Sequence, residues 1–113
     1  MRYNFHMSTG GLTLNVLVFE DAPGRWVAQV LEKDMTAHGP NEYAALAAVQ
    51  LVLQAHVNFD TRHNKTPLSR LKPAPDVYWR AYRTAKPLPI PPNEMAPAHI
   101  EAHVTHERLS RTA

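Results

Sequence analysis

Proline and glycine divide this chain into two halves of different character. Eight of the ten prolines follow residue 60, whereas all four glycines precede residue 40. Proline has no amide hydrogen and disrupts helix interiors and central strands, so regular structure should concentrate in the first half. We predict one domain over residues 1–86, with a core at 1–59 and a wrapping segment at 60–86. Residues 87–113 should form a flexible tail, because they begin with the proline-rich run Pro87-Leu88-Pro89-Ile90-Pro91-Pro92.

Hydrophobic alternation in the first half predicts a β-meander. Residues 12–19 alternate at first and then become continuously apolar, which is typical of a buried strand. A turn over 20–24 follows, and a third short strand is expected over 34–39. The second strand, 25–32, should divide its residues between two faces, with Trp26, Ala28 and Val30 on one face and Val27, Gln29 and Leu31 on the other.

At Asn41 the hydrophobic period changes from two to about 3.6, which predicts a helix over 41–59. Asn41 is a suitable N-cap, because its side-chain oxygen can accept a hydrogen bond from a first-turn amide. The opposite side of this helix is also apolar, at Tyr43, Ala47 and Leu51. The helix is therefore either an alanine-rich core helix or one whose second side serves an oligomer interface. Its main stripe should face the sheet: Ala45, Leu46, Val49, Val52, Leu53, His56 and Val57.

These elements predict an α+β fold, in which a small antiparallel sheet of three to four strands packs against one main helix. A short second helix is expected over 75–85, within the proline-rich extension. The helix would cover one face of the sheet and leave the other partly apolar, around Leu17 or Val18 and Trp26 or Val27. Because exposed apolar faces and open sheet edges favour pairing, we expect a homo-oligomer, dimeric or larger.

Aromatic and basic residues interleave in the expected second helix, in the run Tyr78-Trp79-Arg80-Ala81-Tyr82-Arg83. The rings can pack on the sheet while the arginines face solvent. The run can also contact a protein partner, or bind single-stranded nucleic acid through base stacking and phosphate pairing. Together with two residues of the second strand, it supplies the candidate interface residues: Trp26, Val27, Tyr78, Trp79, Arg80 and Arg83.

Positive charge is concentrated around the same helix. Residues 1–59 carry more acidic than basic groups, whereas residues 62–86 carry seven basic groups and one acid. A basic patch of this kind suits RNA, DNA or an acidic protein surface, and charge alone does not choose among them.

The residues that bear chemistry do not form a convincing catalytic pattern. With no cysteine, the chain cannot use disulfides, thiol catalysis or cysteine-based zinc sites. The acids Glu20, Asp21, Glu32 and Asp34 lie at the predicted strand ends, whereas a two-metal nuclease needs carboxylates that converge. We therefore predict no catalytic residue, no cofactor and no enzymatic activity.

Three histidines near the C-terminus recur at spacings of four and three residues. His99, His103 and His106 would share one face of a helix over 98–111 and could there bind a metal. Because no fourth ligand lies nearby in the sequence, we expect a solvated segment and no metal site.

No apolar run approaches the roughly 18 residues that a membrane span requires. The N-terminal residues also lack the apolar stretch of a secretory signal. We expect a cytoplasmic protein with no membrane partner.

Residues 14–58 resemble the HicB antitoxin family and its stand-alone HicB-like relatives. The resemblance is carried by the strand VLVFED, a turn, the segment GRWVAQVLEKDMTAHG and the helix NEYAALAAVQLVLQAHV. Its characteristic positions are Trp26-Val27-Ala28, Gly39, and Ala44 or Ala45. The residues at these positions are small or apolar and carry no catalytic groups, so the resemblance indicates a fold more than an activity.

The resemblance implies a partial RNase H-like fold, commonly assembled as dimers or tetramers, whose members bind and block a small RNA-cleaving toxin. A small basic toxin is therefore an expected partner. Operator binding is not implied, because residues 60–113 contain no helix-turn-helix or ribbon-helix-helix unit. Two alternatives remain open: an orphan HicB-like oligomerisation or adaptor module without a toxin, and a nucleic-acid-binding protein that uses residues 62–86. Nucleic-acid binding is not favoured.

Overall fold

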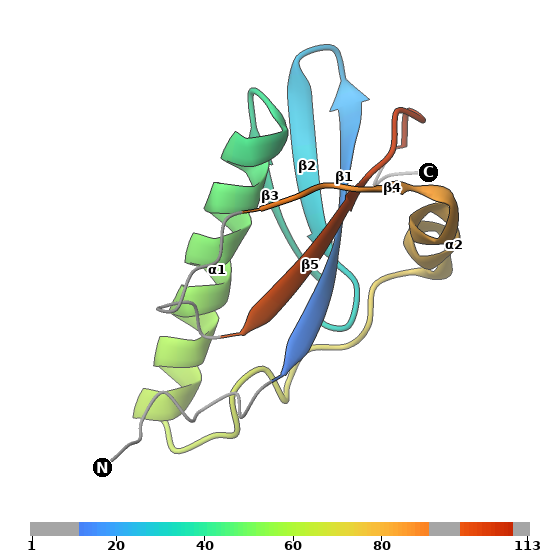
Figure 1. Ribbon diagram of the computed structural model, residues 1–113. Coiled ribbons are helices and arrows are strands. Elements are labelled where there is room, and N and C mark those ends of the chain that lie inside the picture. Colours follow the sequence, from blue (N-terminus) through green and yellow to red (C-terminus); the bar gives the residue numbers. More distant parts are fainter. Residues whose placement is uncertain (1–11, 91–97, 110–113) are drawn as a thin grey trace.

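The computed structural model describes residues 12–90 and 98–109, which form an α+β fold (Figure 1). Three strands come first: β1 (Thr13–Ala22), β2 (Arg25–Val30) and β3 (Met35–Gly39). The long helix α1 (Glu42–Arg62) and the short helix α2 (Asp76–Thr84) follow. Two further strands end the described chain: β4 (Lys86–Pro87) and β5 (His99–Val104).

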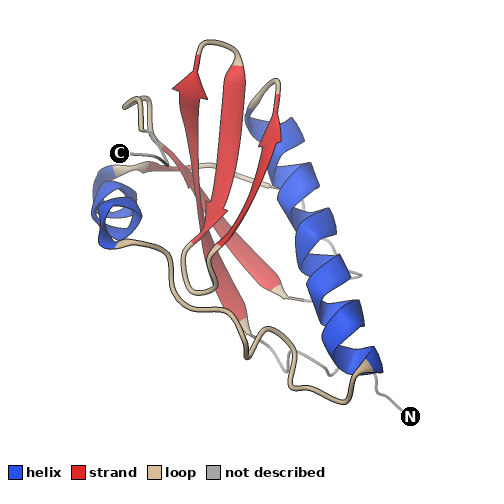
Figure 2. Cartoon of the chain, turned by 180° about the vertical axis from the view of Figure 1, so that it is seen from behind, coloured by secondary structure: helices blue, strands red, loops and turns tan. Residues whose placement is uncertain are grey.

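The strands form one mixed sheet in the order β3-β2-β1-β5-β4. The expected meander is present, because β1 pairs antiparallel with β2 and β2 with β3. The other edge of β1 pairs in parallel with β5, from Thr13 opposite His99 to Val18 opposite Val104. Strand β1, the first strand in the described part of the chain, is therefore the central strand of the sheet (Figure 2).

Five strands, one of them parallel to β1, replace the three to four antiparallel strands that we predicted. The expected boundary at residue 87 was also wrong for the part of 87–113 that is described, because β5 lies inside the sheet. The alternation of β5, His-Ile-Glu-Ala-His-Val, turns Ile100 and Ala102 into the core. Proline prevents regular structure locally, but a strand needs only about six proline-free residues and a free sheet edge to pair with.

Each face of the sheet is covered by one helix, as Figure 1 shows. On one face, Leu14, Val16 and Val18 of β1 pack with the buried stripe of α1. On the other face, Leu17 and Phe19 pack with Tyr78 and Ala81 of α2. Strand β2 and the residue that follows it divide as predicted, with Ala28 and Val30 in the first cluster and Val27 and Leu31 in the second.

We predicted self-association from an exposed apolar face of the sheet, but α2 covers that face. Leu17 and Val27 were expected on that partly apolar face, and both are fully buried. The second helix was predicted correctly at 75–85, but its contact with the sheet was underestimated, because nine residues offer only a narrow apolar face.

Helix α1 begins where the sequence predicted and ends three residues later, at Arg62. Its N-cap is Asn41, whose side-chain oxygen accepts a 2.9 Å hydrogen bond from Ala44 N–H. The first turn lies against Gly39 at the end of β3. A Cβ atom at Gly39 would lie 2.5 Å from Ala45 N and 2.7 Å from the carbonyl carbon of Ala44. Only glycine therefore permits this approach of helix and strand.

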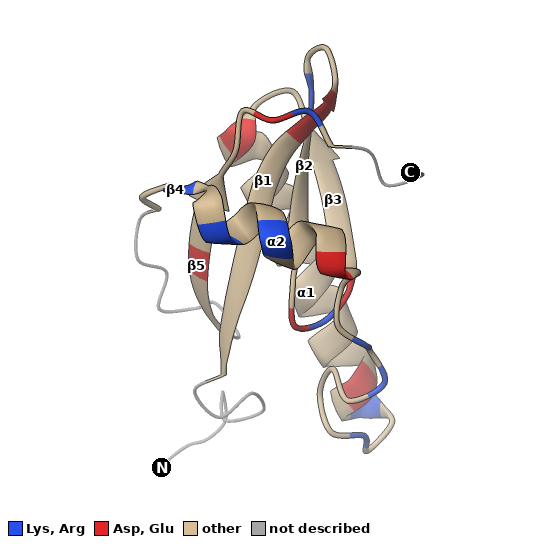
Figure 3. Ribbon diagram, turned by 90° about the vertical axis from the view of Figure 1, so that its right-hand side faces the viewer, with Lys and Arg blue, Asp and Glu red and all other residues tan. Residues whose placement is uncertain are grey.

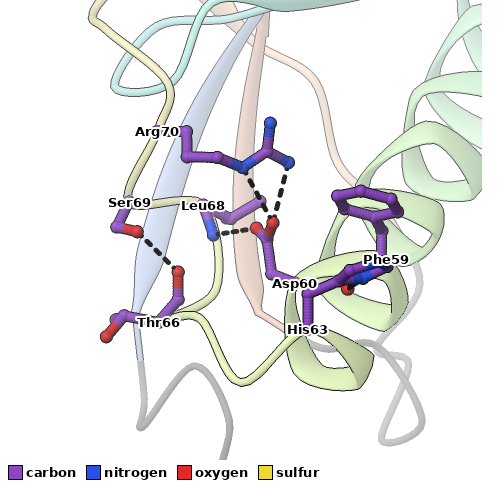
Figure 4. A network of polar contacts seen from close by, with 7 residues as sticks. All are labelled: Phe59, Asp60, His63, Thr66, Leu68, Ser69 and Arg70. Atoms are coloured by element: carbon purple, nitrogen blue, oxygen red, sulfur yellow. Dashed lines mark hydrogen bonds and ion pairs between the residues drawn. The ribbon is translucent and has the colours of Figure 1, made fainter.

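The wrapping segment after α1 is organised by one buried carboxylate (Figure 4). Asp60 is fully buried, and its Oδ2 accepts a 2.8 Å hydrogen bond from Leu68 N–H. Its Oδ1 accepts from Nε and Nη2 of Arg70, at 3.0 and 2.7 Å. The chain turns through positive φ at Asn64 and Leu68, and the Leu68 side chain enters the α1 side of the core. The sequence alone does not reveal this network, because nothing local distinguishes Asp60 from a surface acid.

Candidate functional site on helix α2

The structure buries two of the six candidate interface residues. Val27 is fully buried between β2 and α2, and Tyr78 is 2% exposed. The ring of Tyr78 stacks on Phe19 with centroids 5.6 Å apart. Neither side chain can contact a partner in this fold, so these two predictions were wrong. Both residues are buried because the sheet needs apolar side chains on its α2 face.

The two tryptophans are half-buried and serve packing. Trp26 lies opposite Gly39 in the β2–β3 pair and packs at the edge of the α1-side cluster. Trp79 packs beside α2, and its indole N–H donates a 3.1 Å hydrogen bond to the Ala74 carbonyl. Trp79 thus fastens the start of α2 to the preceding loop.

The two arginines of the candidate set point outward. Arg80 and Arg83 are exposed, and they share the outer side of α2 with Val77, which is 41% exposed. Arg80 forms an ion pair with Asp76 one turn earlier, whereas Arg83 has no ion-pair partner among the residues that the structure describes. Lys86, also exposed, is the first residue of β4 and lies two residues after the end of α2. Figure 3 marks basic residues along α2 and at β4. We call Val77, Arg80, Arg83 and Lys86 the α2 surface.

Tyr82 points to the opposite side of α2, into a polar cluster on the sheet. Its hydroxyl donates to Oδ1 of Asn15 at 2.9 Å, and its ring stacks on His103 with centroids 4.2 Å apart. Burial raises the pKa of Tyr82 to about 12, and the carboxylates of Glu101 and Glu32 add to this shift. Tyr82 therefore donates as a neutral phenol and holds α2 in place.

The tyrosines and arginines that alternate in the sequence thus lie on different sides of α2. Tyr78 and Tyr82 face the sheet, as the packing interpretation predicted, whereas Arg80 and Arg83 face outward. Stacking of nucleic-acid bases on these tyrosines would require them to leave Phe19 and His103. The outer side offers positive charge and one exposed aliphatic side chain, which suits a protein partner better than a base-stacking platform.

The four acids considered for metal binding have separate local partners. Glu20 accepts from Gly24 N–H at 2.8 Å, and Asp21 pairs with Arg25 at 3.2 Å. Glu32 accepts from the backbone and side-chain nitrogens of Asn15 at 2.8 and 2.5 Å. Gln29 donates to Asp34 at 2.7 Å. These contacts distribute the acids between the β1–β2 hairpin and the turn that follows β2.

The three C-terminal histidines lie in and after a strand, not on the helix that their spacing suggested. His99 and His103 are four residues apart in β5, which separates them by about 13 Å. His99 pairs with Glu101 at 2.6 Å, while His103 stacks on Tyr82. Within residues 12–90 and 98–109, no three His, Asp or Glu side chains lie close enough together to hold a metal ion.

No family model matches this chain, and no curated protein or solved structure is significantly similar to it. Among the described helices, neither is long and apolar enough to cross a lipid bilayer.

Proposed function

We propose that this chain is a noncatalytic binding protein of the HicB antitoxin type, which covers the RNA-binding or catalytic surface of a small RNA-cleaving toxin. One support is the arrangement of the residues that carry the resemblance. They form the meander β1–β2–β3 backed by α1. Gly39 and Ala45, two of the small residues on which the resemblance depends, lie where β3 meets the first turn of α1.

The observation that carries the binding role is the α2 surface. Arg80, Arg83 and Val77 are presented on a helix that Tyr78, Trp79 and Tyr82 fasten to the sheet. A surface fixed in this way loses little conformational entropy on binding. Arginine is enriched at protein interfaces and is among the residues that most often carry the binding energy. We infer that the α2 surface contacts an acidic patch on the toxin, even where the toxin as a whole is basic.

Inhibition by occlusion requires no chemistry from the binder. The acids Glu20, Asp21, Glu32 and Asp34 are engaged in local contacts at separate places. A two-metal nuclease would instead need them around one pair of ions. The proposal therefore expects no RNA cleavage by this chain, with or without divalent metal.

The test is co-expression with the product of the neighbouring reading frame, which the proposal expects to be a small basic protein, followed by purification and binding kinetics. We expect a stoichiometric complex that Arg80→Glu/Arg83→Glu weakens by at least tenfold, mainly through the association rate. The loss should shrink in high salt, because exposed charges are screened beyond about 10 Å at 0.1 M. Lys65→Glu/Lys72→Glu is the matched control: it makes the same charge change at exposed residues off α2 and should have a smaller effect.

Three other outcomes would overturn the proposal. Metal-dependent nuclease activity that disappears when Glu20, Asp21, Glu32 and Asp34 are replaced together would make the chain an enzyme. Tight, salt-sensitive RNA or DNA binding that is lost in Arg80→Glu/Arg83→Glu would make it a nucleic-acid-binding protein. A neighbouring protein that neither binds this chain nor cleaves RNA would favour the adaptor alternative.

A further inference from the structure

Two stacked rings are exposed at the C-terminal end of α1 (Figure 4). The ring of His63, the residue that caps the helix, lies on the ring of Phe59 with centroids 4.1 Å apart. Both residues are exposed, and 42% of Phe59 is accessible to solvent. Phe59 covers one face of the imidazole, and no other ring of residues 12–90 and 98–109 lies on the second face. The second face of His63 is therefore open to a flat ligand.

Hydrogen bonds at the end of α1 hold these rings in place. Nδ1 of His63 donates a 2.8 Å hydrogen bond to the Phe59 carbonyl oxygen. Asn64 has a φ of +57° and turns the chain, so that Lys65 N–H donates to the Asp60 carbonyl at 2.8 Å. A residue in the left-handed conformation commonly closes a helix in this way. Side chains that are already positioned lose little conformational freedom when a ligand binds.

Positive charge flanks the open ring. Arg62 and Lys65 lie on either side of His63 in the chain, and both are exposed. The nearest acid in the chain, Asp60, is buried and paired with Arg70 at 2.7 Å. Neither Arg62 nor Lys65 has an ion-pair partner in the part of the chain that the structure describes. Figure 3 shows basic residues at this end of α1 and in the loop that follows.

We propose that the end of α1 binds single-stranded nucleic acid, with one base stacked on His63 and the neighbouring phosphates paired with Arg62 and Lys65. We call Phe59, Arg62, His63 and Lys65 the α1 end surface. Proteins that bind single strands without reading their sequence combine aromatic side chains, which stack on bases, with cations along the phosphates. An acidic peptide would use the two cations but has no flat group for the ring. A double helix keeps its bases stacked on one another, so it offers this surface phosphates alone.

This binding is separate from the toxin binding proposed for the α2 surface. The nucleic-acid alternative drawn from the sequence relied on the rings of α2, and the structure turns Tyr78 and Tyr82 toward the sheet. The rings of the α1 end surface come from another helix. The two helices cover opposite faces of the sheet, and the two surfaces share no residue (Figure 1). Either binding activity can therefore fail while the other is retained.

The first test measures binding of the full chain to fluorescently labelled oligouridylate and oligothymidylate of twelve nucleotides. We expect dissociation constants of about 10–100 μM at low salt. An abasic strand of the same length keeps the phosphates and should bind at least fivefold more weakly. Binding of either strand supports the proposal, and a preference for oligouridylate would identify RNA through its 2′-hydroxyl. A wild type that binds neither strand would overturn the proposal. Equally tight binding of the abasic strand, or equal competition by an oligoglutamate peptide, would show that charge alone acts and would also overturn it.

Substitutions at His63 test the stacking. His63→Ala should weaken oligonucleotide binding at least fivefold, whereas His63→Phe keeps a flat ring and should bind like the wild type. Tyr43→Ala is the matched control, because it removes a ring that is 51% exposed at the other end of the same helix, and it should have no effect. Circular dichroism should be unchanged in all three variants. Equal losses in His63→Ala and His63→Phe would show that the ring does not stack on a base, which contradicts the proposal.

The salt dependence of binding tests the phosphate contacts. For a single strand, the logarithm of the binding constant falls with the logarithm of salt concentration by about 0.7 per phosphate contact. Two contacts predict a slope of about −1.4, and Lys65→Gln should reduce it to about −0.7.

Lys72→Gln is the matched control for Lys65→Gln. Lys72 is exposed in the same loop, but its carbonyl accepts a 2.7 Å hydrogen bond from Asp34 N–H, which places it beside the turn after β2. Its substitution should leave the slope unchanged, as should Arg80→Glu/Arg83→Glu. A slope that Lys65→Gln does not alter, or binding that only Arg80→Glu/Arg83→Glu abolishes, would place the nucleic acid elsewhere and overturn the proposal.

Discussion

The hydroxyl of Tyr82 donates a 2.9 Å hydrogen bond to Oδ1 of Asn15, and this contact joins α2 to the central strand across 67 residues of sequence. The same Asn15 donates to Glu32 in the turn after β2, while the Tyr82 ring stacks on His103 of β5. Parts of the chain that are distant in sequence thus meet at one polar cluster. The cluster sets the rotation of α2, and with it the direction of Arg80 and Arg83.

Tyr82 should make stability depend on pH in the alkaline range. Its pKa in the folded state is about 12, against about 10 in an unfolded chain. As the pH rises, the Tyr82 hydroxyl therefore loses its proton first in the unfolded state. The contribution of Tyr82 to folding stability is complete below pH 10 and is lost as the pH rises toward 12. Urea unfolding at several pH values should show Tyr82→Phe less stable than the wild type at pH 8, with the difference narrowing above pH 10. A constant difference would contradict this role.

Asp60 should make the stability of the protein depend on pH in the acidic range. The hydrogen bond from Leu68 N–H holds the pKa of Asp60 below its usual value, and Arg70 assists, while burial opposes both. The contribution of Asp60 is therefore present above its unfolded pKa, which is about 3.9, and is lost as pH falls through the lower folded value.

We expect Asp60→Asn to destabilise the protein at pH 7 and to flatten the fall in stability below pH 5. Chemical unfolding measured from pH 3 to pH 7 tests this. Asp76→Asn is the matched control, because Asp76 is exposed and its ion pair with Arg80 should contribute little. Equal effects of the two substitutions would show that burial of Asp60 does not matter.

A substitution at Ile100 tests whether β5 contributes to the core of the sheet. Its side chain is 8% exposed and packs in the α1-side cluster. Ile100→Ala should lower the free energy of unfolding by about 2–4 kcal/mol, because it removes buried methyl groups and leaves a cavity. His99→Ala, at the exposed neighbouring position, should change it by less than about 0.5 kcal/mol. If both variants melt like the wild type, residues 99–104 do not belong to the core.

A substitution at Gly39 tests how closely β3 approaches α1. A Cβ at this position would meet backbone atoms of Ala44 and Ala45, which cannot move without displacing the helix. Gly39→Ala should therefore cost about 2–3 kcal/mol of stability, as overpacking does.

Gly24→Ala is the matched control for Gly39. Gly24 has a φ of +73° but open space around it. Alanine there should cost only about 1 kcal/mol of backbone strain. Thermal unfolding of both variants provides the comparison, and a larger loss for Gly24→Ala would reverse our ranking of the two effects.

Local patterns determined the elements of the first 60 residues. The period of two over residues 25–32 placed Val30 and Leu31 on opposite faces of the sheet, because alternate side chains of a strand point to opposite faces. The structure packs Val30 on the α1 side and Leu31 on the α2 side. The capping residue Asn41 and the turn at Gly24 were likewise visible in the sequence, because each satisfies a local backbone requirement. The second helix was found from Pro75 and Asp76 for the same reason.

Only the tertiary structure decided which distant segments meet. The spacing of His99, His103 and His106 fits a helix, while the alternation of Ile100 and Ala102 fits a strand; the open edge of β1 selected the strand. Asp60 became a buried anchor only because Leu68 and Arg70 return to it. Val27 and Tyr78 left the candidate site because α2 folds back over the sheet. In each case the deciding energy is burial or hydrogen bonding between residues far apart in the chain, which no local pattern of side chains encodes.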